Sequence, residues 1–104
     1  MSPRPSQLSI RRRYLICYDI SSDWRRDRIF DTLRSNGDHA QYSVFFCELN
    51  SHELANLRSE LRQYLNYHED QILILDLGQA SNPLEAGLDC LGRAYEPPVR
   101  SHIV

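Results

Sequence analysis

The sequence predicts an α+β domain of the ferredoxin-like type, with the element order strand, helix, strand, strand, helix, strand. Three observations lead to this prediction: apolar runs rich in β-branched and aromatic residues, two stretches with apolar residues at helical spacing, and cap or turn residues between them. The length of 104 residues suits one domain. We expect a flexible N-terminal arm over residues 1–12, a ferredoxin-like core over 13–78 and a C-terminal tail over 79–104.

The first half of the core is predicted to be a strand followed by a helix. Residues 14–20 are apolar or aromatic almost throughout, as in a strand that is buried on both faces. A helix over about 22–35 follows, because Ser21-Ser22-Asp23 provides a hydroxyl N-cap and a carboxylate in the first turn. Its apolar stripe contains Ile29, Phe30 and Leu33, with Trp24 as an outlier near the start. Gly37 is expected to end the helix in the left-handed conformation.

The second half is predicted to hold two short strands, a helix and a strand. Residues 38–49 contain both short strands, because the polar Gln41-Tyr42-Ser43 indicates a bend or a very tight hairpin between them. The second helix, over about 51–66, starts with a capping-box pattern and carries an apolar stripe of Leu54, Leu57, Leu61 and Leu65. A further strand covers 71–77 and is closed by Gly78. In the tail, residues 91–95 and 99–104 each suit a short strand.

The composition is that of a soluble globular domain, with 41% hydrophobic and 25% charged residues. No apolar run is long enough to span a membrane, and the N-terminus lacks the apolar segment of a secretory signal. The three cysteines, Cys17, Cys47 and Cys90, show neither zinc-binding spacing nor a disulfide framework. We therefore expect a cytoplasmic protein without a membrane partner.

Positive charge is concentrated in the first third of the chain. All twelve basic residues are arginine, and residues 1–36 hold eight of them against four acidic residues. Arginine binds phosphate oxygens in a bidentate manner, so this excess favours a nucleic-acid partner, although a compositional bias of the genome would also produce it. The Arg11-Arg12-Arg13 run is either a phosphate contact or a solvated flank of the first strand.

The number of helices limits how much of the sheet can be covered. Two helices cover only one face, yet three of the predicted strands are apolar on both faces. The second face therefore needs a partner, and the simplest is a second copy related by a two-fold axis. The sequence thus predicts a homodimer in which two sheets pack together.

Asp19 interrupts an apolar run one residue before the predicted end of the first strand. A carboxylate buried there requires hydrogen bonds, an opposite charge or a metal. One interpretation is that it accepts backbone N–H bonds from the turn or the helix start. The other is that it binds Mg²⁺, which prefers carboxylate oxygens and keeps several waters. No acidic residue nearby in the sequence completes a site, so two copies of Asp19 in a dimer would supply both ligands.

Arg26 and Arg28 lie in the first turns of the first predicted helix. They can bind phosphates beside Asp19, or pair with acidic residues of the same helix: Asp23, Asp27 and Asp31. Ser43 can orient a metal-bound water or a phosphate, or it can simply form the turn. Phe45 and Phe46 are expected to pack in the core and the dimer interface. The histidines share no spacing that indicates a metal site.

Taken together, these residues resemble the CRISPR-associated protein two family. The resemblance rests on Tyr18-Asp19-Ile20, on Arg26-Asp27-Arg28 before an apolar helix, on Gly37 and on Gln41-Tyr42-Ser43-Val44-Phe45. It covers roughly residues 13–77, and the terminal Ile-Val resembles the family's last strand. The chain departs from the family in carrying His39 where some members have arginine, and in having a longer N-terminal arm.

The resemblance implies a ferredoxin-like homodimer with packed sheets and a C-terminal extra strand. It also implies an endonuclease that cleaves single-stranded RNA or double-stranded DNA with Mg²⁺ or Mn²⁺, with Asp19 as the catalytic metal ligand. Arg26, Arg28 and the Arg11-Arg12-Arg13 run would bind nucleic acid, and three residues would support the site: Tyr18, Ser43 and Phe45. The partner would be the adaptation integrase, which inserts new spacers in antiviral defence.

The sequence is also compatible with two other functions. The first is a non-catalytic DNA-binding scaffold of the spacer-acquisition complex, whose arginines contact phosphates. The second is a toxin-like ribonuclease of the virulence-associated protein D type, which shares the fold.

Overall fold

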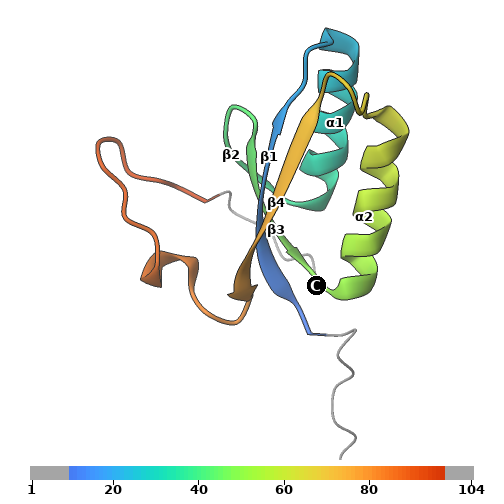
Figure 1. Ribbon diagram of the computed structural model, residues 1–104. Coiled ribbons are helices and arrows are strands. Elements are labelled where there is room, and N and C mark those ends of the chain that lie inside the picture. The colour runs from blue at the N-terminus through green and yellow to red at the C-terminus, as the bar shows by residue number, and fades with distance from the viewer. Residues whose placement is uncertain (1–9, 98–104) are drawn as a thin grey trace, which may run out of the picture.

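The computed structural model describes residues 10–97, and they form one sheet covered by one layer of helices (Figure 1). The elements are β1 (Arg12–Asp19), α1 (Asp23–Asn36), β2 (Asp38–Gln41), β3 (Val44–Leu49), α2 (Ser51–Tyr64) and β4 (Gln71–Gln79). The strands lie in the order β2-β3-β1-β4, and all neighbours are antiparallel. The predicted α+β fold and its element order are confirmed. None of the helices between residues 10 and 97 is long and apolar enough to cross a membrane.

Both helices begin at the cap residues that the sequence indicates. Ser22 is the N-cap of α1, and its side chain accepts a hydrogen bond from the Arg25 N–H. Asn50 caps α2 with a complete capping box, because its side chain accepts from the Glu53 N–H while the Glu53 carboxylate accepts from the Asn50 N–H. These bonds satisfy N–H groups that have no partner within the helix. The starts of α1 and α2 are therefore decided locally.

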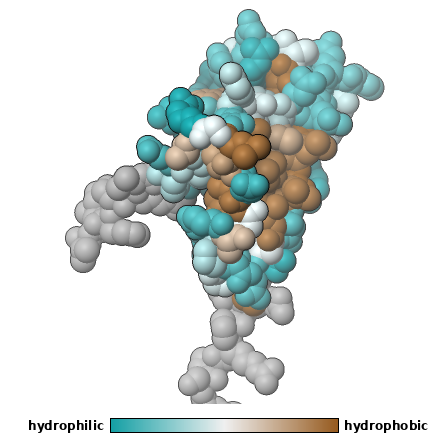
Figure 2. All heavy atoms as spheres, turned by 90° about the vertical axis from the view of Figure 1, so that its left-hand side faces the viewer, coloured by the Kyte–Doolittle hydropathy of each residue, from teal (hydrophilic) through white to brown (hydrophobic). Residues whose placement is uncertain are grey.

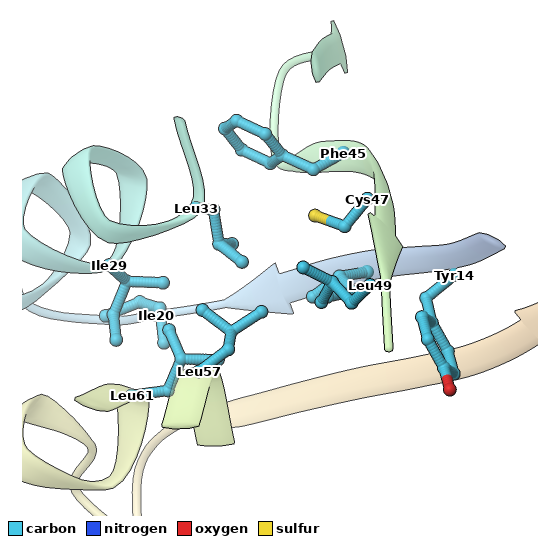
Figure 3. Packing of buried hydrophobic residues seen from close by; sticks show 10 residues of the cluster. Tyr14, Ile20, Ile29, Leu33, Phe45, Cys47, Leu49, Leu57 and Leu61 are labelled. Atoms are coloured by element: carbon cyan, nitrogen blue, oxygen red, sulfur yellow. The ribbon is translucent and has the colours of Figure 1, made fainter. Parts of the chain in front are cut away.

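The hydrophobic core lies between the sheet and the helices (Figure 3). The helices contribute four buried side chains that point toward the strands: Ile29, Leu33, Leu57 and Leu61. The strands β1 and β3 meet them with alternate residues: Tyr14, Ile16, Phe45, Cys47 and Leu49. Because side chains of a strand alternate between its faces, the intervening residues point away from the helices. The core is thus one-sided.

The opposite face of the sheet is apolar and open. Leu15 of β1 lies between Phe46 of β3 and Leu75 of β4, and Cys17 lies between Val44 and Leu73. Leu73 and Leu75 are 53% and 57% exposed. Figure 2 shows apolar residues gathered on the side of the molecule that faces away from the helices. This arrangement confirms that the two helices cover one face only. The strands predicted to be buried on both faces are buried on one face within this chain.

The segment after β4 contains a short 3₁₀ helix, Leu84–Ala86, and no further strand up to residue 97. The strand predicted at 91–95 is wrong, because Gly92 has φ 87° and the Cys90 thiol donates a hydrogen bond to the Arg93 carbonyl at 3.2 Å. These features make a turn. The ring of Tyr95 still packs on Phe46, with 6.1 Å between ring centroids. The strand predicted at 99–104 and most of the predicted arm lie outside the described residues.

Gly37 joins α1 to β2 in an extended conformation, with φ −169° and ψ −165°. The left-handed conformation predicted for it is therefore wrong. Glycine is required for a different reason: a Cβ atom at this position would overlap the sulfur of Cys47 and the carbonyl oxygen of Phe46. The close approach follows from the strand pairing, because Asp38, the next residue, is paired with Phe46 across the hairpin.

Replacing Gly37 with alanine should lower the free energy of unfolding by about 1–3 kcal/mol, the usual cost of adding a methyl group to a packed site. Chemical denaturation measures the change. Gly87→Ala is the matched control, because a Cβ there meets no atom within 4 Å. Equal losses in both variants would show that close packing is not what requires glycine at position 37.

Candidate functional site

Asp19 is the last residue of β1 and is paired with Gln71 of β4. By strand alternation it belongs to the open face, with Leu15 and Cys17. Its side chain is exposed, and between residues 10 and 97 it accepts no hydrogen bond and forms no ion pair. The burial expected from the apolar run is wrong, because the run fills the middle of the strand while Asp19 stands at the end that reaches solvent.

Residues other than Asp19 cap the first helix and accept the hydrogen bonds of the turn that precedes it. Ser22 provides the side-chain cap of α1. The backbone N–H of Ser21, in the turn after Asp19, donates to the carboxylate of Asp70 at 3.2 Å. Asp19 is therefore not an N-cap or turn acceptor in this structure, and its carboxylate is available to a ligand on the open face.

Asp70 and Arg25 form a buried ion pair beside this turn. The Asp70 side chain is fully buried, and Arg25 is 19% exposed. Two bonds join them, from Arg25 Nε to Asp70 Oδ2 at 2.7 Å and from Nη2 to Oδ1 at 3.1 Å. The N–H of Asn66 also donates to Asp70, at 3.0 Å. The guanidinium of Arg25 first, and then these backbone N–H groups, hold the pKa of Asp70 well below its usual range.

This pair joins two connections that are distant in the sequence. Arg25 belongs to the first turn of α1, just after β1, and Asp70 directly precedes β4. The ion pair therefore fixes the backbone on both sides of the Asp19–Gln71 pairing. No pattern in the sequence predicts this pair, because 45 residues separate the partners and no local spacing connects them. The one indication in the sequence is that Asp70 directly precedes an apolar strand.

Arg26 and Arg28 differ in what they contact. Arg26 donates to the carbonyl of Ile20 at 3.1 Å and pairs with Asp23 at 2.8 Å. Same-helix pairing is thus observed for Arg26. Arg28 forms no ion pair with any residue between 10 and 97, and its guanidinium carbon lies 5.3 Å from the ring centroid of Trp24.

The three arginines at the start of β1 are each paired with a carboxylate. Arg11 pairs with Glu53 at 2.6 Å, Arg12 with Asp76 at 2.9 Å and Arg13 with Glu48 at 3.0 Å. Seven steps along β1 separate Arg12 from Asp19, on the order of 20 Å at the rise of a strand. The arginine run therefore lies at the opposite end of the sheet from Asp19, and it is partly neutralised.

The three supporting residues lie close to the end of β1. The N–H of Tyr18 donates to the carbonyl of Ser43 at 3.2 Å, which places the β2–β3 turn beside Asp19. Tyr18 stacks on Phe45 with 6.4 Å between ring centroids, and Phe45 is fully buried. Burial raises the pKa of the Tyr18 hydroxyl. The structure thus places the backbone of Tyr18 and Ser43 near Asp19, whereas the side chains of Tyr18 and Phe45 pack on the helix-covered face.

No group of three or more His, Cys, Asp or Glu side chains that could hold a metal ion is found among residues 10–97. Asp19 by itself contributes a single exposed carboxylate at the end of β1. A hard divalent cation can be bound by one or two carboxylates and waters, so this donor fits part of such a site. The rest would have to come from another chain or from the substrate.

Comparison with known proteins places the fold and these motifs in a family. A family model described as CRISPR associated protein Cas2 matches residues 12–82. The chain belongs to the Cas2 family. A Geobacter sulfurreducens relative named CRISPR-associated endoribonuclease Cas2 is 32% identical over 91 residues, which cover 88% of this chain and 95% of the relative. A Thermus thermophilus relative named CRISPR-associated endonuclease Cas2 2 is 32% identical over 90 residues, covering 86% and 92%.

Solved structures have the same fold as this Cas2 chain. A Thermus thermophilus protein described as hypothetical superposes with a TM-score of 0.70 at 32% identity, covering 85% of this chain and 99% of its own. Streptococcus pyogenes Cas2 superposes with a TM-score of 0.67 at 24% identity, covering 77% and 99%. The ferredoxin-like architecture predicted from the sequence is thereby confirmed.

Asp70→Asn should destabilise the Cas2 fold at pH 7, because it removes the charge that pairs with Arg25. The pKa of Asp70 is lower in the folded state than its unfolded value of about 3.9, so the pair stabilises the fold above that pH. The stabilisation is lost as the pH falls toward the depressed pKa. Denaturant unfolding from pH 7 to pH 3 should therefore show the difference between variant and wild type narrowing below about pH 4.

Glu69→Gln is the control for this measurement. Glu69 also pairs with Arg25, at 3.0 Å, but its side chain is largely exposed. Exposed pairs contribute little, so this variant should unfold nearly like the wild type at every pH. A difference between Asp70→Asn and wild type that does not depend on pH would contradict the assignment.

Proposed function

We propose that this Cas2 chain is a metal-dependent endonuclease of CRISPR adaptation, in which Asp19 binds Mg²⁺ or Mn²⁺. The observation that carries the proposal is the exposed carboxylate of Asp19, which has no hydrogen-bond or ion-pair partner within residues 10–97 and stands at the edge of an open apolar sheet face. The names of the relatives, endoribonuclease and endonuclease, support phosphodiester cleavage of RNA or DNA. The family match favours this function over that of a toxin-like ribonuclease.

A two-fold dimer is part of the proposal. A stable interface buries about 800 Å² on each partner, and the apolar face formed by β1, β3 and β4 is the surface available for it. Sheet-to-sheet packing about a two-fold axis would bring the ends of both β1 strands to one interface. Asp19 would then have its symmetry mate as the second carboxylate, so a site would not require a complete group of ligands within residues 10–97.

The residues around Asp19 have separate tasks in this proposal. A bound divalent ion would supply an activated water and stabilise negative charge on the scissile phosphate. Asp19 holds the ion through its charge, and the Arg25–Asp70 pair keeps the turn after Asp19 in place. Ser43, in the adjacent turn, offers a hydroxyl for hydrogen bonding to a phosphate or a water. Arg28 is the arginine of α1 best placed for phosphate, since Arg25 and Arg26 already bind carboxylates.

A second function is favoured by one observation. Residues 10–97 contain no group of three or more His, Cys, Asp or Glu side chains that could hold a metal, so Asp19 does not form a complete site within them. The chain would then act as a scaffold that binds DNA and joins the adaptation integrase without cleaving. In both proposals the integrase is a partner, and binding to nucleic acid is electrostatic and independent of sequence.

Asp19→Asn should abolish metal-dependent cleavage while the fold and the dimer persist. The amide keeps the shape of the side chain but lacks the charge that binds a hard cation. Both copies carry the change, so the repulsion between the two close carboxylates is removed and the dimer should not weaken. Cleavage of labelled single-stranded RNA and duplex DNA with Mg²⁺, Mn²⁺ or chelator measures the effect.

Asp31→Asn is the matched control, because Asp31 is an exposed acidic residue of α1 remote from the end of β1. It should cleave like the wild type. The catalytic proposal is falsified if Asp19→Asn cleaves at the wild-type rate. Absence of cleavage by the wild type with every metal, together with stable binding to the integrase, would favour the scaffold.

Leu75→Asp should convert the dimer to a monomer at micromolar concentration. Leu75 lies on the open face in the middle of the edge strand β4, paired with Leu15, and a two-fold axis would place the new charge in the interface twice. Light scattering on a sizing column gives the mass. Ala55→Asp adds the same charge on the exposed side of α2, so it should remain dimeric. A wild-type monomer in this assay would overturn the dimer.

A further inference from the structure

Trp24 is the sole tryptophan of the chain and is 59% exposed. It occupies the first turn of α1, two residues after the N-cap Ser22. Tryptophan is seldom left so open in a small domain unless one part of its ring has a polar or binding role. Neither the core nor the open sheet face includes it, since α1 covers the other side of the sheet (Figure 1). The exposed ring therefore needs a separate explanation.

Two neighbours hold this ring in place. Arg28 is one helical turn further along α1, and its guanidinium carbon is 5.3 Å from the centroid of the Trp24 ring. Tyr64, the last residue of α2, contacts Trp24 edge to face, with 6.2 Å between centroids and 74° between planes. We call Trp24, Arg28 and Tyr64 the aromatic platform. Its three members come from two helices, so its geometry depends on the fold.

The platform combines an exposed π surface with an available positive charge. Among the arginines at the start of α1, Arg25 and Arg26 pair with carboxylates, whereas Arg28 forms no ion pair with residues 10–97. A planar guanidinium lying against an indole ring can also be stacked upon by a third planar group. Aromatic rings interleaved with arginine are the chemistry with which proteins bind single-stranded nucleic acid.

The platform also lies at a suitable end of the molecule. In Figure 1 the start of α1 and the end of α2 are at the upper end, where β1 ends and β4 begins. Asp19 is the last residue of β1, so the platform and the proposed metal ligand share this end. The platform is in the helix layer, so a second copy that covers the open sheet face would leave it accessible.

We infer that the aromatic platform binds an unpaired nucleobase of a single-stranded nucleic acid, with the base stacked on Trp24 and an adjacent phosphate on Arg28. This inference rests on the proposed function in one respect: it takes the ligand to be a nucleic acid. Stacking reads the flat face of a base rather than its edge, so binding is independent of sequence. It also does not read the sugar, so DNA and RNA strands bind alike.

The fluorescence of Trp24 tests the inference directly, because no other tryptophan contributes. The full-length protein is titrated with a short oligothymidylate, with the matching oligouridylate, and with an abasic strand of the same length and charge. Chelator is present throughout, so that no strand is cut. We expect both base-carrying strands to quench the fluorescence and the abasic strand to bind more weakly without quenching.

Variants separate stacking from charge. Trp24→Ala should weaken binding of a labelled oligothymidylate about tenfold, the effect of losing one stacked base, and leave binding of the abasic strand unchanged. Tyr67→Ala is the control, because Tyr67 is also a largely exposed aromatic residue but does not belong to the platform. Arg28→Lys keeps the positive charge but lacks the planar guanidinium, so binding should weaken only by the part that stacking on the guanidinium contributes. Trp24→Phe, which retains a ring, should restore most of the binding and guards against a folding defect.

Several outcomes would overturn the inference. One is equal quenching by the abasic and base-carrying strands; another is unchanged affinity of Trp24→Ala for oligothymidylate. The result is independent of catalysis, because Asp19→Asn should show the same quenching as the wild type. If Asp19→Asn loses cleavage but no strand quenches the fluorescence of either the wild type or Asp19→Asn, the platform is rejected and the proposed nuclease function stands.

Discussion

The constraint on which this structure depends is that a sheet with two apolar faces has only two helices to cover it. The core side takes Ile16, Phe45 and their neighbours, and α1 and α2 close over them. The other side leaves Leu73 and Leu75 in solvent. Because exposed apolar surface is costly, the open face determines where a second copy would bind. It also determines what Asp19 can do, since Asp19 stands at the edge of that face.

A second interaction explains why Asp19 has no partner within the part of the chain that the structure describes. The turn between β1 and α1 needs acceptors for its backbone N–H groups, and a nearby carboxylate could have been used for this purpose. Ser22 and Asp70 take these roles instead. Asp70 can be buried because Arg25 binds it through two hydrogen bonds. The fold is therefore stabilised at this end by a carboxylate from a distant connection, and Asp19 has no structural task within residues 10–97.

The distribution of arginine is also clearer in three dimensions. The first third of the sequence has an excess of positive charge, which suggests one basic surface. In the structure Arg11, Arg12 and Arg13 pair with carboxylates of α2, β4 and β3, far from Asp19. Near the start of α1, Arg28 lies on an indole ring rather than on a carboxylate. Within residues 10–36, Arg28 and Arg34 form no ion pair with a described residue, and Arg28 is the one that adjoins an aromatic ring.

The sequence by itself determined the elements and their order, because helix caps, apolar spacing and turn residues act over a few residues. Ser22, the Asn50–Glu53 box and the tight turn at Tyr42-Ser43 all lie where their patterns predict. Only the tertiary structure decided the rest. The packing that requires glycine at position 37 and the Arg25–Asp70 pair each depend on segments brought together by the sheet. Such contacts join residues far apart in the chain, so no local pattern encodes them.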